Sequence, residues 1–478
     1  MNRRRILLLC AVVFSLSGCT LAPKYTRPEA PVPSSWPTGS AYDNAPVSPG
    51  ASSAAEIPWR MVFADERLQK VIETALRNNR DLRTAALNAE RARALYGVQR
   101  SELFPTVNAE ALGAAQRVPA DLSRSGEVSR PEEYNVRLGV SSWEIDFFGR
   151  IRSLKDAALE EYLATEQARR SAQILLVSGV ANAYLALAAD RETLRLARST
   201  MEAQQASYNL IRKRVDVGLS PELDLRQAQT RVDAARVDTA FYTQRVAQDE
   251  NSLDLLVGSK VPADLLPAGL DTVIPPKEVS AGLSSDVLLS RPDILQAENR
   301  LRGAHANIGA ARAALFPRIS LTTSFGTSSM ELSSLFGSGQ ASWNFAPRVV
   351  LPIFDARSWS ALEVVKADRE IALAQYDKAI QSAFRDVADA LAARGTVEEQ
   401  LAAQRSLTEA VAETYRLSNL RYEKGVDSFL GVLDAQRSLY AAQQGLIAVR
   451  LARVASLVNL YAMLGGGADA GEPGREGP

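Results

Sequence analysis

The stretch Leu315-Phe316-Pro317-Arg318-Ile319-Ser320-Leu321 joins two kinds of sequence. An alanine-rich helical pattern stops at the proline, because proline cannot continue a helix. After it, apolar residues alternate with serine and threonine, which is typical of a strand. The same three residues occur earlier, at Leu103-Phe104-Pro105. The sequence therefore predicts two helices that each end in Phe-Pro just before a strand.

The repetition extends well beyond this junction. Asp81 precedes Pro105 by the same number of residues as Asp293 precedes Pro317. Farther on, a Tyr…Gly…Ala-Gln pattern centred on Gly218 recurs around Gly425. The sequence thus predicts two tandem repeats, at 61–265 with strands at about 105–147 and at 286–465 with strands at about 317–354, joined by a linker or equatorial segment at 266–285.

Each repeat contains a long helix followed by a second helix. The segments Arg150–Gly218 and Arg357–Gly425 have equal length, and the first shows apolar residues at helical spacing without any proline. A helix of about 68 residues would extend about 100 Å, which suggests coiled-coil packing. The second helices are expected at Glu222–Val257 and Phe429–Leu464. The expected fold class is mainly α, with long antiparallel helical hairpins whose tips lie at the two glycines.

The segments after each Phe-Pro alternate with period two. Each repeat supplies two such strands, at about 105–117 and 134–147, and at about 317–328 and 342–354. Two soluble β-hairpins fit this pattern. Strands of a membrane β-barrel, apolar outside and polar inside, fit it as well. Four strands cannot enclose a pore, so the barrel requires several chains.

The N-terminus carries an export signal. Three arginines precede the apolar run Ile6–Leu16, and Leu16-Ser17-Gly18-Cys19 fits a bacterial lipobox. We expect a lipoprotein signal peptide at 1–18 and a mature chain that begins with Cys19, modified by S-diacylglycerol and N-palmitoyl groups. An ordinary signal peptide with an incidental cysteine is the alternative. A Pro-rich arm at 19–60 follows, and 466–478 is expected to be a disordered tail.

Composition excludes several functions. Lysine plus arginine and aspartate plus glutamate both number 55, so the formal net charge is zero and nucleic acid is not an expected partner. Both cysteines precede residue 20 and His305 is the single histidine, so we expect no metal site and no cofactor. Glu222 and Asp224 form a carboxylate pair, but no base or nucleophile accompanies them. An enzyme is therefore not expected.

Taken in order along a duplicated chain, several motifs resemble the TolC-like outer-membrane efflux channel family, most closely its lipid-anchored OprM type. The motifs that carry this resemblance are Asp146-Phe147-Phe148-Gly149-Arg150, Leu223-Asp224-Leu225-Arg226-Gln227-Ala228-Gln229, Ser290-Arg291-Pro292-Asp293-Ile294, Ile308-Gly309-Ala310-Ala311-Arg312-Ala313-Ala314-Leu315-Phe316-Pro317 and Leu433-Asp434-Ala435-Gln436-Arg437-Ser438-Leu439.

The resemblance implies a homotrimer in the outer membrane. Three chains would form one 12-stranded barrel of transmembrane strands and a periplasmic tunnel of 12 helical rods, which answers the problem of four strands per chain. Such a channel would be a passive duct for drugs or other small molecules. It would work with a periplasmic adaptor protein and an inner-membrane pump of the RND type. Multidrug efflux and antibiotic resistance would follow.

The resemblance also assigns a periplasmic gate near Gly425. Leu430 and Asp434 share one helical face, and in a trimer they would form an apolar ring and a carboxylate ring. A packed leucine and a solvated aspartate are the plainer interpretation. Asp190 and Tyr422 match positions that latch neighbouring helices, where a hydroxyl-to-carboxylate bond would stabilise the closed tip by about 1–3 kcal/mol. Glu423 stands where a basic latch partner is expected, so Arg421 or Lys424 would have to replace it.

The adaptor would bind at the hairpin tips. The residues concerned are Gly218, Leu219 and Ser220 on the first tip, and Gly425, Val426 and Asp427 on the second. Both glycines are also expected simply because they make turns. A lipoprotein that spans the periplasm without transporting anything is the competing hypothesis. It predicts strands without a lipid-facing aromatic belt, whereas Trp143, Trp343 and Phe345 at strand positions favour the barrel.

Overall fold

The computed structural model describes residues 20–45, 47, 54–282 and 284–468. Cys19 and the predicted signal peptide lie outside the described residues, as does most of the predicted tail. The helices are α2 (Trp59–Val62), α3 (Glu66–Asn78), α4 (Arg80–Ser101), α5 (Arg150–Asp216), α6 (Glu222–Val257), α7 (Pro292–Ala313), α8 (Ala356–Glu423) and α9 (Phe429–Met463). The strands are β1 (Val107–Ala115), β2 (Glu132–Glu144), β3 (Arg318–Ser329) and β4 (Ala341–Val350).

The chain forms two compact units, and each is built from three segments. The first unit contains 1–29, 88–165 and 296–376, and so holds the strands. The second contains 30–87, 166–295 and 377–478, and so holds the hairpin tips. Each unit combines segments from both halves of the sequence.

The strands form one antiparallel sheet in the order β1-β2-β3-β4. Val107 of β1 pairs with Val140 of β2, and Phe325 of β3 pairs with Trp343 of β4. All four predicted strands are present, with ends that differ from the prediction by a few residues. Among the described residues, the outer edges of β1 and β4 have no strand partner.

A β-bulge interrupts β2 near its end. Val140 pairs with Thr323, but the next pair is Trp143 with Leu321, so β2 has one residue more than β3 between the two pairs. Ser142 has φ of 54°, in the left-handed region that serine rarely adopts. Its N–H donates to the Thr322 hydroxyl at 3.2 Å, which satisfies the donor that the bulge removes from the ladder. The alternation in the sequence gave no indication of this bulge.

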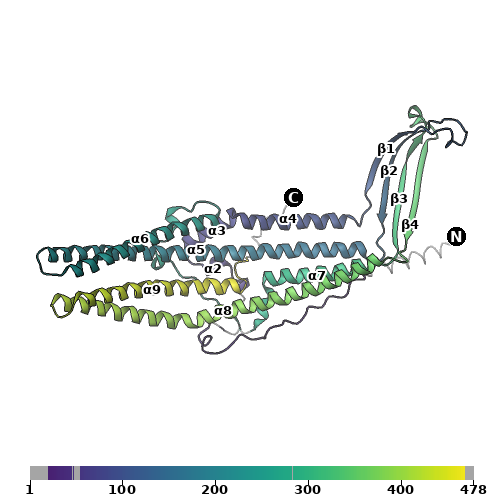
Figure 1. The fold of residues 1–478 in the computed structure, drawn as a ribbon. Helices are drawn as coiled ribbons and strands as arrows, with labels where there is room; N and C mark the ends of the chain where they lie inside the picture. The colour runs from purple at the N-terminus through teal and green to yellow at the C-terminus, as the bar shows by residue number, and fades with distance from the viewer. Residues whose placement is uncertain (1–19, 46, 48–53, 283, 469–478) are drawn as a thin grey trace. The chain divides into compact units, whose positions relative to one another are not determined.

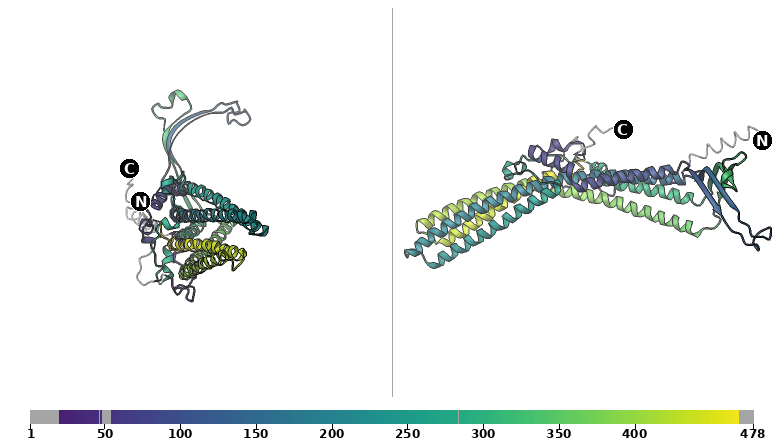
Figure 2. Two further views of the ribbon diagram at one scale, coloured as in Figure 1. Left: turned by 90° about the vertical axis from the view of Figure 1, so that its left-hand side faces the viewer. Right: turned by 90° about the horizontal axis from the view of Figure 1, so that it is seen from above.

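The long helices form two antiparallel hairpins. The predicted helix from Arg150 ends at Asp216, and α6 begins and ends where the sequence indicated. In the second repeat, α8 covers 68 residues and α9 ends one residue before the predicted Leu464. Figures 1 and 2 show that the α5–α6 and α8–α9 hairpins lie side by side near their tips. The mainly α fold with one antiparallel sheet is therefore confirmed.

The core of the second unit surrounds large aromatic side chains. Trp59, Tyr184 and Tyr461 are fully buried. The Tyr184 hydroxyl donates to the Leu265 carbonyl at 3.1 Å, and Tyr461 meets the Phe63 ring edge to face at 6.1 Å. Buried tyrosines are tolerated because their hydroxyl groups find acceptors. This core forms one end of the hairpins, and the tips extend from it.

The N-terminal arm packs on the first unit through residues 20–27. The Thr20 and Ser153 hydroxyls lie 3.1 Å apart, and Arg27 donates from Nε to Glu298 at 3.1 Å. The Glu298 side chain is only 1% exposed, and Arg302 of the same helix also binds it. A buried carboxylate must be compensated in this way, so Arg27 fixes the arm to α7.

The helices α5 and α9 each contain an 18-residue segment that is apolar enough, by composition alone, to cross a membrane. In the α5 segment 56% of the residues are buried inside the chain, and in the α9 segment 39%. Packing within the chain therefore explains much of the apolar character of α5. More of the apolar residues of α9 remain exposed and can contact neighbouring helices.

Candidate functional site

One face of the sheet is apolar across all four strands. The register places side chains from adjacent strands on the same face wherever they pair. Trp343 on this face is 77% exposed. Large exposed apolar surfaces indicate contact with lipid or another chain. The residues of this apolar face include Val107, Ala109, Val136, Leu138, Val140, Trp143, Ile319, Leu321, Phe325, Trp343, Phe345 and Val349.

The opposite face of the sheet is polar. Glu110 and Arg137 form an ion pair across β1 and β2, with 2.9 Å between Glu110 Oε2 and Arg137 Nε. The remaining residues of this polar face include Asn108, Asn135, Glu144, Arg318, Ser320, Thr322, Ser324, Asn344 and Arg348. The bulge maintains this division, because without it Trp143 would lie on the polar face and Glu144 on the apolar face.

The two hairpin tips have the same backbone turn. Gly218 has φ of 75° and Gly425 has φ of 72°. Leu219 N–H donates to the Arg214 carbonyl at 2.8 Å, and Val426 N–H donates to the Arg421 carbonyl at 3.0 Å. With the accompanying bonds from the glycine N–H groups, each tip is a Schellman motif. Both glycines are therefore required by the turn, as the sequence predicted.

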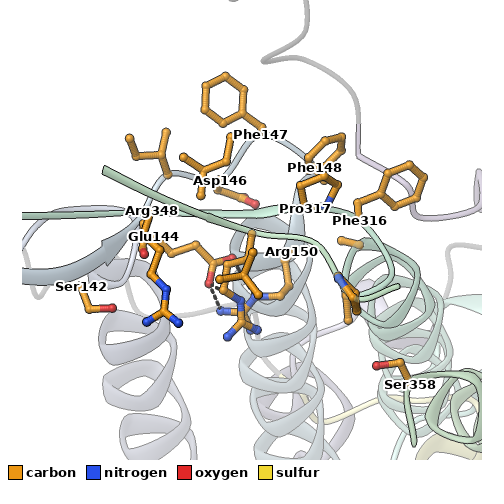
Figure 3. A pocket seen from close by; sticks show the side chains of 18 of the residues that line it. Ser142, Glu144, Asp146, Phe147, Phe148, Arg150, Phe316, Pro317, Arg348 and Ser358 are labelled. Atoms are coloured by element: carbon orange, nitrogen blue, oxygen red, sulfur yellow. Dashed lines mark hydrogen bonds and ion pairs between the residues drawn. The ribbon is translucent and has the colours of Figure 1, made fainter. Parts of the chain in front are cut away.

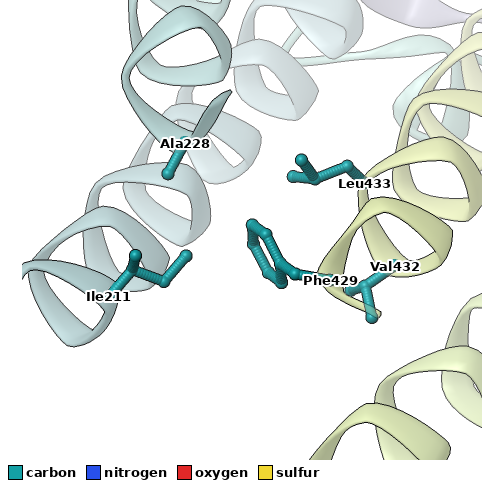
Figure 4. Packing of buried hydrophobic residues seen from close by; sticks show 5 residues of the cluster. All are labelled: Ile211, Ala228, Phe429, Val432 and Leu433. Carbon is teal, nitrogen blue, oxygen red and sulfur yellow. The ribbon is translucent and has the colours of Figure 1, made fainter. Parts of the chain in front are cut away.

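Apolar side chains join the two hairpins just behind the tips. Phe429 of α9 points toward Ile211 of α5, and Ala228 of α6 lies beside them (Figure 4). Val432 and Leu433 of α9 complete this tip cluster. All five side chains are buried. The tips are thus held together mainly by a small apolar contact.

Two arginines add polar contacts at the same level. Arg214 of the first hairpin donates from Nη1 to the Tyr422 hydroxyl of the second at 2.9 Å. Arg421 stays within its own tip, where its Nε lies 2.5 Å from Asp427 Oδ2. Each arginine is the fourth residue before its tip glycine. Equivalent positions of the repeat therefore make different contacts.

Leu430 and Asp434 lie on the other side of α9 from the tip cluster. Leu430 is 59% exposed. Asp434 is exposed as well and forms an ion pair with Arg437 on the same helix. The structure brings both predicted gate residues onto one exposed face of α9 beside the second tip.

Asp190 lies much farther from the tips. It accepts from Arg245 Nε of α6 at 3.0 Å. Asp249 is close to the same arginine, and burial together with the neighbouring Asp190 carboxylate raises its pKa to about 6. Asp190 and Arg214 are separated along α5 by roughly 36 Å at 1.5 Å per residue. Within one chain, Asp190 and Tyr422 therefore have separate partners.

The family model for outer membrane efflux proteins matches residues 71–259 and 283–466, which is most of the chain. This chain belongs to the outer membrane efflux protein family. The probable efflux pump outer membrane protein TtgC of Pseudomonas putida is 50% identical over 466 residues, 97% of this chain and 96% of the relative. The outer membrane protein OprJ of Pseudomonas aeruginosa is 41% identical over 96% of this chain and 95% of its own length.

Solved structures of outer membrane channels have the same fold. A membrane protein from Pseudomonas aeruginosa gives a TM-score of 0.87 at 41% identity, covering 94% of this chain and 100% of that one. The open state of the Neisseria gonorrhoeae MtrE outer membrane channel gives 0.84 at 39% identity, over 94% and 99%. The predicted family, the fold of a barrel with a helical tunnel, the outer-membrane location and the efflux role are confirmed.

In this outer membrane efflux protein, the contact of Arg214 with Tyr422 was not predicted from the sequence. Asp224 was considered there only as part of a carboxylate pair, whereas the Ser220 hydroxyl donates to Asp224 Oδ2 at 3.1 Å and so fixes the first tip. The duplication could have drawn attention to these arginines, because Arg214 and Arg421 occupy equivalent positions in the two repeats. It could not have shown that the two arginines bind different partners. No cluster of three or more potential metal ligands occurs within the part of the chain that the structure describes.

Proposed function

We propose that this chain is the outer-membrane channel of a tripartite efflux pump and acts as a passive duct without chemistry on its cargo. The two-faced sheet with two free edges is the observation that carries the proposal. Free edges must pair or be covered. Three copies of the four-stranded sheet would close into a barrel of twelve strands, with the apolar face toward lipid and the polar face toward the lumen.

The length of the strands supports a membrane barrel. They contain 9, 13, 12 and 10 residues, and a tilted membrane strand needs about 9–11. Trp343 and Phe345 are exposed on the apolar face, where a membrane barrel carries aromatic residues. The helical hairpins of three copies would then form the tunnel of 12 rods in the periplasm.

The hairpin tips are proposed as the adaptor site. Leu219 and Val426 directly follow the tip glycines, and both are exposed apolar residues, at 76% and 61%. A periplasmic adaptor protein would bind these tips together with Ser220 and Asp427 and connect the duct to an inner-membrane pump of the RND type. The identical backbone turns would present two similar contact surfaces per chain.

The gate is proposed at Leu430 and Asp434. In a trimer their exposed face of α9 would give a leucine ring beside a carboxylate ring, and the carboxylates would favour cations. We propose the latch at Tyr422 and Asp190, each through its own arginine: Tyr422 through Arg214, and Asp190 through Arg245.

We further propose the division into two repeats, 61–265 and 286–465, with the segment 266–285 between them. The matching turns at Gly218 and Gly425 support it. The lipid on Cys19 would assist targeting or trimer assembly, since the strands already embed the chain. A Cys19→Ser variant exported through a cleavable signal should then still form trimers.

The test is reconstitution of the detergent-extracted protein in planar bilayers, with its mass measured in the same detergent. A trimer that conducts ions is the expected result. A monomer without current would favour the competing structural lipoprotein, which spans the periplasm without transport.

A further inference from the structure

A cavity of about 490 Å³ lies where the sheet meets the long helices of the first unit. Its walls come from the last residues of β2, from the starts of β3 and α8, and from the end of β4 (Figure 3). A cavity of this size can hold the charged end of a small organic molecule. Its charged side chains are arginines and carboxylates, and the contacts of each decide what the cavity can bind.

Glu144 has no free capacity for a further cation. Arg150 donates to it from Nε at 2.9 Å and from Nη2 at 2.8 Å. Arg318 Nε lies 3.2 Å from the second oxygen of the same carboxylate. A carboxylate bound by two guanidinium groups leaves one positive charge uncompensated.

The other two carboxylates of the cavity cap helices. Asp146 accepts from the Arg152 backbone N–H at 2.9 Å and from Arg152 Nε at 3.2 Å, at the start of α5. Asp355 accepts from the Arg357 N–H at 3.0 Å and from the Ser358 hydroxyl at 2.6 Å, at the start of α8. These bonds hold the pKa of Asp355 below its usual range. Both acids are therefore committed to helix N-termini.

The arginines, in contrast, retain unused donors. Arg348 of β4 pairs in register with Ser320, on the polar face, and has no ion-pair partner among the described residues. Arg318 is more than half exposed and uses one N–H group on Glu144. A guanidinium has five N–H donors in a planar fork that suits carboxylates, sulfonates and phosphates.

Aromatic rings complete the lining. Phe148 and Phe316 are stacked with their centroids 5.0 Å apart, and Phe147 also lines the cavity. The site thus combines unused guanidinium donors with apolar ring surface. An organic anion that carries an aromatic or apolar body satisfies both, whereas a small inorganic anion uses only the donors.

We propose that this cavity is a binding site for organic anions that travel through the duct. The inference rests on the proposed function, because the polar face of the sheet is a lumenal face only in a closed barrel. Glu144, Arg318 and Arg348 all belong to that face. A trimer would carry three such sites around the lumen.

The experiment measures binding of naphthalene-1-sulfonate to the detergent-solubilised full chain by titration calorimetry. The neutral 1-naphthol and inorganic phosphate serve as comparison probes. We expect the sulfonate to bind at least tenfold more tightly than either, and Arg348→Gln to weaken it at least tenfold. Arg348→Lys should restore part of the affinity, and Arg300→Gln, an exposed arginine of α7, should have no effect.

Equal affinity of the Arg348→Gln variant and the unchanged chain would overturn the site, provided that both melt at the same temperature. Equal affinity for phosphate would overturn the assignment to organic anions. Bilayer recordings separate this inference from the proposed function. A conducting channel whose current the sulfonate does not reduce would contradict the site alone, whereas sulfonate binding without any current would contradict the duct.

Discussion

The sheet and the hairpin tips are held together in different ways. Each inner strand of the sheet pairs along its length with two neighbours, so its register is fixed by many bonds at once. The two tips are joined by five buried side chains and by the Arg214–Tyr422 bond. A change in register should therefore disrupt the whole sheet, whereas the loss of single contacts should weaken the association of the tips gradually. The gate proposed at these tips needs the second behaviour.

Removing the bulge should produce the largest effect. Ser142→Val places a β-branched side chain at φ of 54°, where such residues are rarely found, and so disfavours the bulge. Loss of the bulge at unchanged chain length moves Trp143 to the polar face and Glu144 to the apolar face. On the lipid side of a membrane barrel, an arginine or lysine costs about 2–4 kcal/mol at mid-depth, and a glutamate or a charge near the surface costs less. We expect loss of trimers in outer-membrane extracts, measured by native electrophoresis.

Ser142→Gly is the control for that variant, because glycine adopts a positive φ without strain, keeps the bulge and should assemble normally. Normal assembly of the Ser142→Val variant would show that the bulge does not set the faces of the sheet.

The tip cluster should respond next. Phe429→Ala removes a ring that is packed between the hairpins, and such truncations cost about 3 kcal/mol. Because the ring joins the two tips, the cost should appear as easier opening, with more current in planar bilayers and an unchanged trimer. Phe241→Ala, which truncates an exposed ring on α6, should leave the current as it is. Equal currents in both variants would remove the tip cluster from the gate.

Breaking the bond between the hairpins should have a smaller effect. Tyr422→Phe removes the acceptor of Arg214 at a cost of about 1.5 kcal/mol, or roughly a tenfold change in the open-to-closed ratio. Single-channel recording measures the open fraction. Arg214→Gln should give a similar increase, and the double variant should add little to either. Additive effects would mean that the two residues act separately.

A change in the tip turn itself should have a smaller effect still. Gly425→Ala places a side chain at φ of 72°, which costs about 1 kcal/mol. Gly431→Ala, in the first turn of α9 with open space around it, should stabilise the chain slightly instead. Thermal unfolding should show midpoint shifts of opposite sign for the two variants. Shifts of the same sign would contradict the assignment of Gly425 to the turn.

The smallest effect is a pH dependence at Asp249. Its pKa is about 6 in the folded chain against an ordinary value of 3.8, so the folded state binds the proton more tightly than the unfolded state. Stability should fall as the pH rises from about 4 to about 6, and change little above that. The Asp249→Asn variant should lack this component. If the melting temperatures of the unchanged chain and the Asp249→Asn variant depended on pH in the same way, Asp249 would not contribute to the pH dependence.

Much of the fold was predictable because its elements are long and strongly patterned. The helix α6 could be bounded from Pro221 and Gly258, which exclude further helix at either end. The strands followed from their alternation. The bulge could not be predicted, because Ser141-Ser142 resembles any other pair of polar strand residues.

The site was less predictable than the fold. Sequence identified Tyr422 but not its partner, since Arg214 lies on the other hairpin and nothing in its neighbourhood marks it. The partner of Asp190 is likewise remote in sequence, on α6. The anion cavity escaped notice because its arginines come from β3, β4 and α5, and only the register and the helix start bring them together.

The bulge in β2 also sets a rule for changing the length of the barrel wall. Before Ser141 the outward positions of β2 carry even numbers, and after Ser142 they carry odd numbers. Insertions on either side must therefore come in pairs of residues, matched in both neighbouring strands, to keep every side chain facing its present environment. A thicker or thinner membrane could be matched in steps of about 6.8 Å of strand, and in no smaller step.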